Sequence, residues 1–137
     1  MNPKTNALVF GSIPEISFRG SFFIGADIFL RYGEHRGVNR GFGAVHIWAE
    51  HSKDLIELGY PTRDDVARFV SDLIRPRCPI YCEFNNPRGN HRLAVLKTAI
   101  GVVYLEQTYN QENEPFYSVV TAFPKGKAHG TQIGSVR

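Results

Sequence analysis

Two patterns of apolar residues divide the chain near residue 80. Before it the clearest pattern is helical, because apolar residues recur from Val66 to Leu73 at positions i, i+3, i+4 and i+7, which share one helix face. Thr62 is suited to the N-cap, and Asp65 follows three residues later, as in a capping box. Pro76 cannot continue a helix. The sequence therefore predicts a helix that begins after Thr62, ends before Pro76 and packs its apolar face on a core.

The region before this helix is less regular. A further helix is predicted over about residues 44–58, with Gly59 as its C-cap. Residues 33–43 contain four glycines among basic side chains, which is typical of a loop whose backbone approaches another group closely. The apolar segment 22–32 fits either a helix or a strand. Residues 1–20, with two prolines and two glycines, are predicted to be an irregular lead-in.

From Ile80 onward the pattern favours strands. Segments 80–84, 93–98, 102–106 and 117–122 are rich in β-branched and aromatic residues. The connections between them are short, which favours an antiparallel meander. Helices followed by such a sheet give an α+β domain, in which N-terminal helices pack on a four-stranded antiparallel sheet.

Composition and charge narrow the class of protein. A chain of 137 residues fits one domain, and its net charge of +3 suits an anionic partner without requiring one. Residues 1–7 are polar, unlike a signal peptide, and no apolar run approaches the roughly 20 residues that span a bilayer, so no membrane partner is expected. Cys78 and Cys82 provide two of the four ligands of a structural zinc site, and no Walker or Rossmann glycine spacing is present. The sequence therefore predicts reduced cysteines, no metal and no cofactor.

The strongest candidates for catalysis are His46 and His51. RNA cleavage by transesterification needs a base that removes the proton of the ribose 2′-OH and an acid that protonates the leaving 5′-oxygen. Two imidazoles meet both needs near neutral pH. Five residues of a regular helix, however, place the two rings roughly 140° apart. Either His46 precedes the first regular turn and reaches the same cleft as His51, or one of the two has a capping or packing role.

Other side chains are candidates for holding phosphate or RNA. Thr121 is placed to donate a hydrogen bond to a phosphate oxygen, and alternation puts Tyr117 on the same strand face, where it can stack on a base. Both are also ordinary strand residues. Lys97 interrupts an apolar strand and either extends at an edge or points into a cleft. The remaining RNA-binding candidates are Arg36, Arg92, Lys125 and Lys127, and His129 is a reserve acid or base.

Four segments together resemble a known family of nucleases. They are GEHRG at 33–37, GFG at 41–43, HIWAEH at 46–51 and YSVVTAFP at 117–124. In this order they resemble the barnase–EndoU–colicin–RelE-like (BECR) superfamily, in particular the toxin domains at the ends of polymorphic bacterial toxins. The resemblance covers residues 30–137 and implies a nuclease core over 33–137, with 1–32 as a lead-in of the same domain.

The resemblance also implies roles for individual residues. His46 matches the helix histidine of the family and Thr121 its last-strand hydroxyl, while His51 and Lys97 match less closely. The glutamate base of barnase-like members has no clear counterpart, with Glu83 and Glu106 as the two possibilities. The resemblance further implies metal-independent cleavage of RNA, frequently of tRNA, that leaves a 2′,3′-cyclic phosphate.

These observations lead to one main hypothesis and two alternatives. The main hypothesis is a metal-independent endoribonuclease toxin domain that is delivered by a larger protein, acts on RNA in the cytoplasm of a target cell and is inhibited by an acidic immunity protein. A noncatalytic RNA-binding module is the first alternative. A toxin with other chemistry, such as ADP-ribosyl transfer, is the second.

Overall fold

A computed structural model describes residues 1–84, 92–97, 100–126 and 130–137. The helices are α1 (Gly43–Glu57), the 3₁₀ turn η1 (Arg63–Asp65) and α2 (Val66–Leu73). The strands are β1 (Val9–Ile13), β2 (Ile16–Phe18), β3 (Ser21–Phe23), β4 (Ala26–Phe29), β5 (Glu34–Gly37), β6 (Arg40–Phe42), β7 (Pro79–Cys82), β8 (Leu93–Lys97), β9 (Gly101–Tyr109), β10 (Pro115–Pro124) and β11 (Thr131–Ser135).

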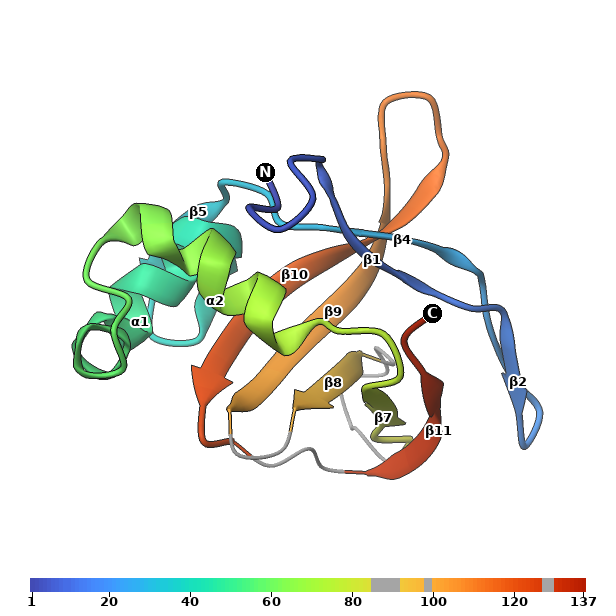
Figure 1. Cartoon of the computed structure of the whole chain (residues 1–137). Helices are drawn as coiled ribbons and strands as arrows, with labels where there is room; N and C mark the ends of the chain where they lie inside the picture. Colours follow the sequence, from blue (N-terminus) through green and yellow to red (C-terminus); the bar gives the residue numbers. More distant parts are fainter. Residues whose placement is uncertain (85–91, 98–99, 127–129) are drawn as a thin grey trace.

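A curled seven-stranded sheet forms the body of the molecule (Figure 1), in the order β1-β4-β10-β9-β8-β7-β11. Neighbouring strands are antiparallel except β4 and β10, which are parallel. Two hairpins, β2–β3 and β5–β6, stand outside this sheet. The sheet is therefore mixed, and its members come from both ends of the chain.

The sheet contains a predicted part and an unpredicted part. Strands β7, β8, β9 and β10 pair in sequence order as an antiparallel meander, which confirms the prediction for residues 80–122. The predicted overall fold is wrong, because six strands precede the first helix and the sheet has seven strands rather than four. The segments 1–20 and 22–32, predicted as a lead-in and as an ambiguous stretch, supply β1 to β4.

Strand pairing over long sequence distances explains this error. Ile28 of β4 is fully buried and lies in register with Tyr117 of β10, so β4 is stabilised by a strand from the other end of the chain. At the far edge of the sheet, the N–H of Arg137 donates a hydrogen bond to the carbonyl of Ser12 in β1, at 3.0 Å. The two edges of the sheet thus approach each other, as in a partly closed barrel.

The two helices begin in different ways. The N–H of Thr62 donates to the Asp65 carboxylate at 3.0 Å, and the reciprocal contact completes the predicted capping box, which starts η1 and leads into α2. In the first turn of α1, backbone carbonyls of the preceding segment accept hydrogen bonds from N–H groups that have no partner within the helix. The N–H of Ala44 donates to the Arg31 carbonyl, and the N–H of Val45 donates to the Tyr32 carbonyl. The start of α1 is therefore fixed to the end of the segment that follows β4.

A β-bulge in β10 divides the two faces of the sheet. Val119 lies opposite Leu105 of β9, but Thr121 lies opposite Tyr104, so one extra residue stands between the two pairs. Since Tyr104 and Leu105 point to opposite faces, Thr121 points away from Val119. The face with Leu105 and Val119 belongs to the hydrophobic core, which also contains the apolar residues of α2 (Val66, Phe69, Val70 and Leu73).

Two further predictions can be compared with the structure. Cys78 and Cys82 are buried free thiols, and burial raises the pKa of the Cys82 thiol. In the described part of the chain, neither helix has the length and apolar character needed to cross a membrane.

Candidate functional site

The site is built around His46, in the first turn of α1. Strand β10 pairs with β4 only at Tyr117 and Ser118. Helix α1 packs on β10, and its His46 lies near the C-terminal half of that strand. The Arg31 guanidinium stacks 4.1 Å from the ring centre of Phe42, the residue before α1, and donates to the Ser118 hydroxyl at 2.8 Å. These contacts hold the start of the helix against β10, and the His46 side chain is 3% exposed.

Glu50 lies one helical turn after His46 and contacts its ring. The distance between Nε2 of His46 and Oε1 of Glu50 is 2.7 Å, as expected for residues i and i+4 on one helix face. The same carboxylate oxygen accepts a hydrogen bond from the N–H of Asn39, in the β5–β6 hairpin, at 3.2 Å. The hairpin and the helix therefore both orient this carboxylate.

The other ring nitrogen of His46 faces His35 of β5. The two Nδ1 atoms are 3.0 Å apart and the ring centroids 5.2 Å apart. Gly41 makes this approach possible: a methyl group added to it would lie 2.7 Å from Nδ1 of His46, and its φ of 150° is one that other residues rarely adopt. The predicted close approach of the glycine-rich segment is thus an approach to His46.

The charge state of His46 follows from its surroundings. Burial lowers its pKa below the ordinary value of 6.5, against the opposing effect of the Glu50 carboxylate, while His35 and His51 add to the lowering. The ring is therefore neutral at pH 7, and its Nε2–H donates to Glu50. A neutral ring with Nε2 protonated has its lone pair on Nδ1, toward His35.

A pocket of about 260 Å³ opens beside this pair. Its walls come from the β5–β6 hairpin, α1, β9, β10 and the residue before β8: Asn39, Gly41, His46, Glu50, Arg92, Tyr104, Val120, Thr121 and Phe123. Within the described part of the chain, the buried Oγ1 of Thr121 has no hydrogen-bond partner. Burial raises the pKa of Tyr104, so its hydroxyl keeps its proton. The pocket thus contains an acid–base pair, two hydroxyls and the Arg92 cation, which also pairs with Glu106 at 3.2 Å.

Several predicted site residues lie elsewhere. His51 does not line this pocket, and its ring packs edge-on against Phe123 with a centroid distance of 5.0 Å. Tyr117 lies in the core, 1% exposed, and its hydroxyl donates to the Ile24 carbonyl at 2.7 Å. Because the bulge reverses the alternation of β10, Tyr117 and Thr121 do not share a face, and the predicted stacking of Tyr117 on a base is wrong.

The predicted basic residues are also distributed over the molecule. Lys97 has the same orientation as Val103 and Leu105, on the core face, and lines a different pocket together with Lys125. Arg36 is exposed on β5, where its Nε donates to the Glu34 carboxylate at 3.0 Å. Lys127 and His129 lie outside the described residues. Among the described candidates, the structure brings His46, Thr121 and Arg92 together.

Sequence reasoning missed Glu50 and His35. Glu50 lies inside the quoted segment 46–51, and its spacing of four residues from His46 was the signal that indicated contact on a helix. Glu83 and Glu106 were considered instead; Glu106 pairs with Arg92, and Glu83 is exposed. His35 had no local signal, because its contact with His46 depends on how the hairpin folds over α1.

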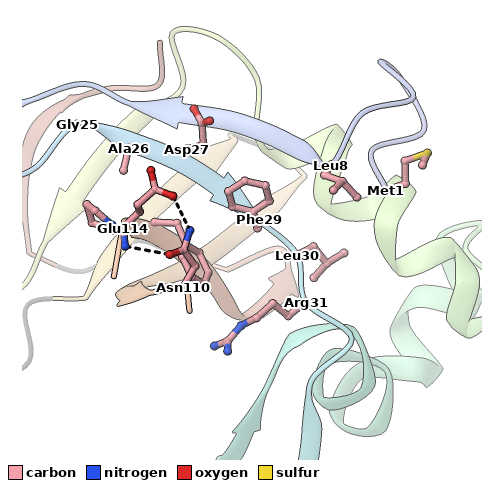
Figure 2. Close-up of a pocket in the computed structure, with 12 residues that line it drawn as sticks. Met1, Leu8, Gly25, Ala26, Asp27, Phe29, Leu30, Arg31, Asn110 and Glu114 are labelled. Carbon is pink, nitrogen blue, oxygen red and sulfur yellow. Dashed lines mark hydrogen bonds between the residues drawn. The ribbon is translucent and has the colours of Figure 1, made fainter. Parts of the chain in front are cut away.

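A larger cavity exists near the other end of β10 (Figure 2). It has a volume of about 690 Å³ and is lined mainly by apolar side chains, with Arg31 at one side and the hydrogen-bonded Asn110 and Glu114 at another. No histidine lines it. The acid–base groups are therefore in the smaller pocket.

Comparison of the chain with models of known protein families, with curated proteins and with solved structures found no match.

Proposed function

We propose that this chain is a metal-independent endoribonuclease that uses the pocket beside His46. The observation that supports it best is the position of the unpartnered, buried Thr121 hydroxyl in the same pocket as the Glu50–His46 pair. A buried hydroxyl without a partner costs free energy in the folded state. In a phosphodiester-cleaving enzyme this cost has a use, because the hydroxyl donates to a phosphoryl oxygen when substrate is bound.

The chemistry assigns one role to each wall of the pocket. Glu50 accepts the proton of the ribose 2′-OH, and His46 orients its carboxylate through Nε2–H. The 2′-oxygen then attacks phosphorus while the bond from phosphorus to the 5′-oxygen breaks. Thr121 and Arg92 stabilise the charge on the phosphoryl oxygens. Tyr104, whose hydroxyl keeps its proton, is our candidate for the acid that protonates the 5′-oxygen.

The biological setting remains part of the proposal. A net charge of +3 suits RNA as a partner, with tRNA as the expected target, and an acidic immunity protein that covers Arg92 would block access to the pocket. As a toxin the domain would be delivered by a larger protein and act in the cytoplasm of the target cell. The proposal depends on the geometry of the pocket and on the segments 33–51 and 117–124, and it does not require the fold of the BECR superfamily.

Incubation of the purified protein with total tRNA in EDTA tests this function. We expect cleavage products that end in a 2′,3′-cyclic phosphate, and their loss in Glu50→Gln with folding retained. RNA binding without cleavage in the unmodified protein would instead support a noncatalytic binding module. Cleavage that is absent in EDTA and restored by magnesium would refute the metal-independent mechanism.

A further inference from the structure

His35 faces the site but has no role in the proposed cleavage. It lies on β5, one strand of the hairpin that covers the start of α1, and its side chain is exposed while His46 is buried. Its Nδ1 is 3.0 Å from Nδ1 of His46. In the described part of the chain, these two rings and Glu50 form the one group of three or more metal-ligating side chains whose ligand atoms lie within 4.8 Å of one another.

The hydrogen bonds around His46 determine what its free nitrogen can do. Glu50 takes up Nε2–H at 2.7 Å, so Nδ1 of the neutral ring presents a lone pair to His35. A histidine that binds a metal through one nitrogen typically donates its other N–H to a carboxylate, which fixes the tautomer and the orientation of the ring. Glu50 already has that position, and the N–H of Asn39 holds it there.

We infer that His35 and His46 form a site for a zinc-like divalent transition metal ion, with their Nδ1 atoms as ligands and Glu50 as the carboxylate that orients His46. Two nitrogens at about 2.0–2.1 Å from one zinc ion are roughly 3.0–3.4 Å apart at angles between ~95° and tetrahedral. The observed separation of 3.0 Å is within this range. Imidazole ligands select zinc, copper or nickel over magnesium and calcium. Solvent would complete the coordination on the exposed side of His35.

An ion at this position would regulate the pocket. If the proposed nuclease function holds, metal binding fixes His46 and adds positive charge beside Glu50, and this charge opposes the transfer of the 2′-OH proton to the carboxylate. Zinc is then an inhibitor of a metal-independent enzyme. Binding itself does not depend on the nuclease proposal, because it needs only the two rings and their geometry.

Calorimetric titration of the purified protein with Zn²⁺ and with Mg²⁺ at pH 7.5 tests the site. We expect one Zn²⁺ per chain and no binding of Mg²⁺. His35→Ala should weaken zinc binding at least tenfold, whereas His51→Ala should leave it unchanged, since His51 packs against Phe123 outside the cluster. Glu50→Gln should weaken it about 10- to 100-fold, as for other carboxylates behind a metal-bound histidine.

Two results would overturn the site: no zinc binding by the unmodified protein, or zinc binding that His35→Ala leaves unchanged. Circular dichroism checks that each variant folds, and the exposed position of His35 makes its substitution the safest of the set.

A second measurement separates this inference from the proposed function. For the unmodified protein and for each variant, the rate of tRNA cleavage with Zn²⁺ is divided by the rate of the same protein in EDTA. We expect a ratio well below one for the unmodified protein and a ratio near one for His35→Ala. Zinc binding by a protein that cleaves no RNA in EDTA would sink the nuclease alone, and cleavage in EDTA without zinc binding would sink the metal site alone.

Discussion

Two pockets lined by different elements of the molecule differ in the chemistry they can support. The His46 pocket has the Glu50–His46 pair, the unpartnered Thr121 hydroxyl and one cation, Arg92. The second, which we call the Lys97 pocket, has a volume of about 440 Å³ and more cations: its lining includes Lys4, Arg75, Lys97 and Lys125.

The carboxylate of the Lys97 pocket is already occupied. Asp72 accepts hydrogen bonds from Lys4 and from the Tyr60 hydroxyl, each at 2.6 Å. Its charge is therefore neutralised within the fold by a lysine. The donors to Glu50 are instead the neutral His46 ring and the N–H of Asn39, and Glu50 shares its pocket with a hydroxyl that has no partner among the described residues. The comparison teaches that the number of cations is a poor guide to a phosphate-cleaving site. A titratable pair that shares a pocket with an unsatisfied donor is a better one.

The largest expected effect is that of Glu50→Gln. If Glu50 is the base, the substitution should lower the rate of RNA cleavage by about 10²- to 10⁴-fold. Asp54→Asn is a matched control, because it removes the same charge one turn further along α1 from an exposed residue that does not line the His46 pocket. Single-turnover cleavage of a defined tRNA measures both. An equal loss in the two variants would contradict a specific role for Glu50.

The second prediction concerns Thr121→Val. It should lower cleavage by about 10²-fold, because one donor to the phosphoryl oxygens is lost. It should also raise the free energy of unfolding by about 1 kcal/mol, because a buried hydroxyl without a partner is replaced by a methyl group. Urea unfolding and cleavage rates measure the two effects, and Thr121→Ser should keep the activity. A stability decrease in Thr121→Val would show that the hydroxyl has a partner in solution.

Local patterns in the sequence were sufficient for about half of this architecture. The meander from β7 to β10 and the capping box at Thr62 follow from neighbours in sequence, and the sequence predicted both. Strand β4 depends on a partner far along the chain, Tyr117 for Ile28, and β1 pairs in turn with β4. Both strands are too short to show a period of their own. Long-range pairing is the information that one sequence does not reveal.

The same division applies to the site. His46, Thr121 and Arg92 were predicted and lie in one pocket. Tyr117 was grouped with Thr121 by strict alternation, which the bulge at Val120 breaks in β10. Lys97 was a candidate because it interrupts an apolar strand, but its pairing places it on the core face of β8. A one-residue insertion in a strand reverses every side chain beyond it. No local signal in the sequence marks this bulge.

The third prediction separates the two pockets by pH. Burial lowers the pKa of His46 in the folded state, so the unfolded chain takes up a proton more readily than the folded one. The free energy of unfolding should therefore be highest above the unfolded pKa of about 6.5 and should fall as the pH is lowered below it. His51 acts in the same direction because burial also lowers its pKa. His46→Gln should make this decline shallower.

Asp72 should respond in a lower pH range. Burial raises its pKa, but hydrogen bonds from Lys4 and Tyr60 outweigh this effect, and the net pKa is below the ordinary 3.8. Its contribution to stability is therefore complete above pH of about 4 and is lost as the pH falls through the folded pKa. Urea unfolding from pH 7.5 to 3 measures both ranges. If His46→Gln instead makes the decline below pH 6.5 steeper, the pKa of His46 is raised in the folded protein and the assigned direction is wrong.

The smallest expected effect on RNA binding and cleavage is that of Lys97→Ala. Comparing this variant with Arg92→Ala shows how far bound RNA extends over the surface. A cation that contacts a phosphate adds about one unit to the slope of log affinity against log salt, so Arg92→Ala should reduce that slope by about one. Lys97→Ala should leave the slope unchanged and cleavage within about twofold, since Lys97 lines the other pocket. Filter binding of tRNA at several salt concentrations measures this. Equal losses of slope in both variants would mean that the RNA backbone passes over both pockets, and that the Lys97 pocket belongs to the substrate-binding surface.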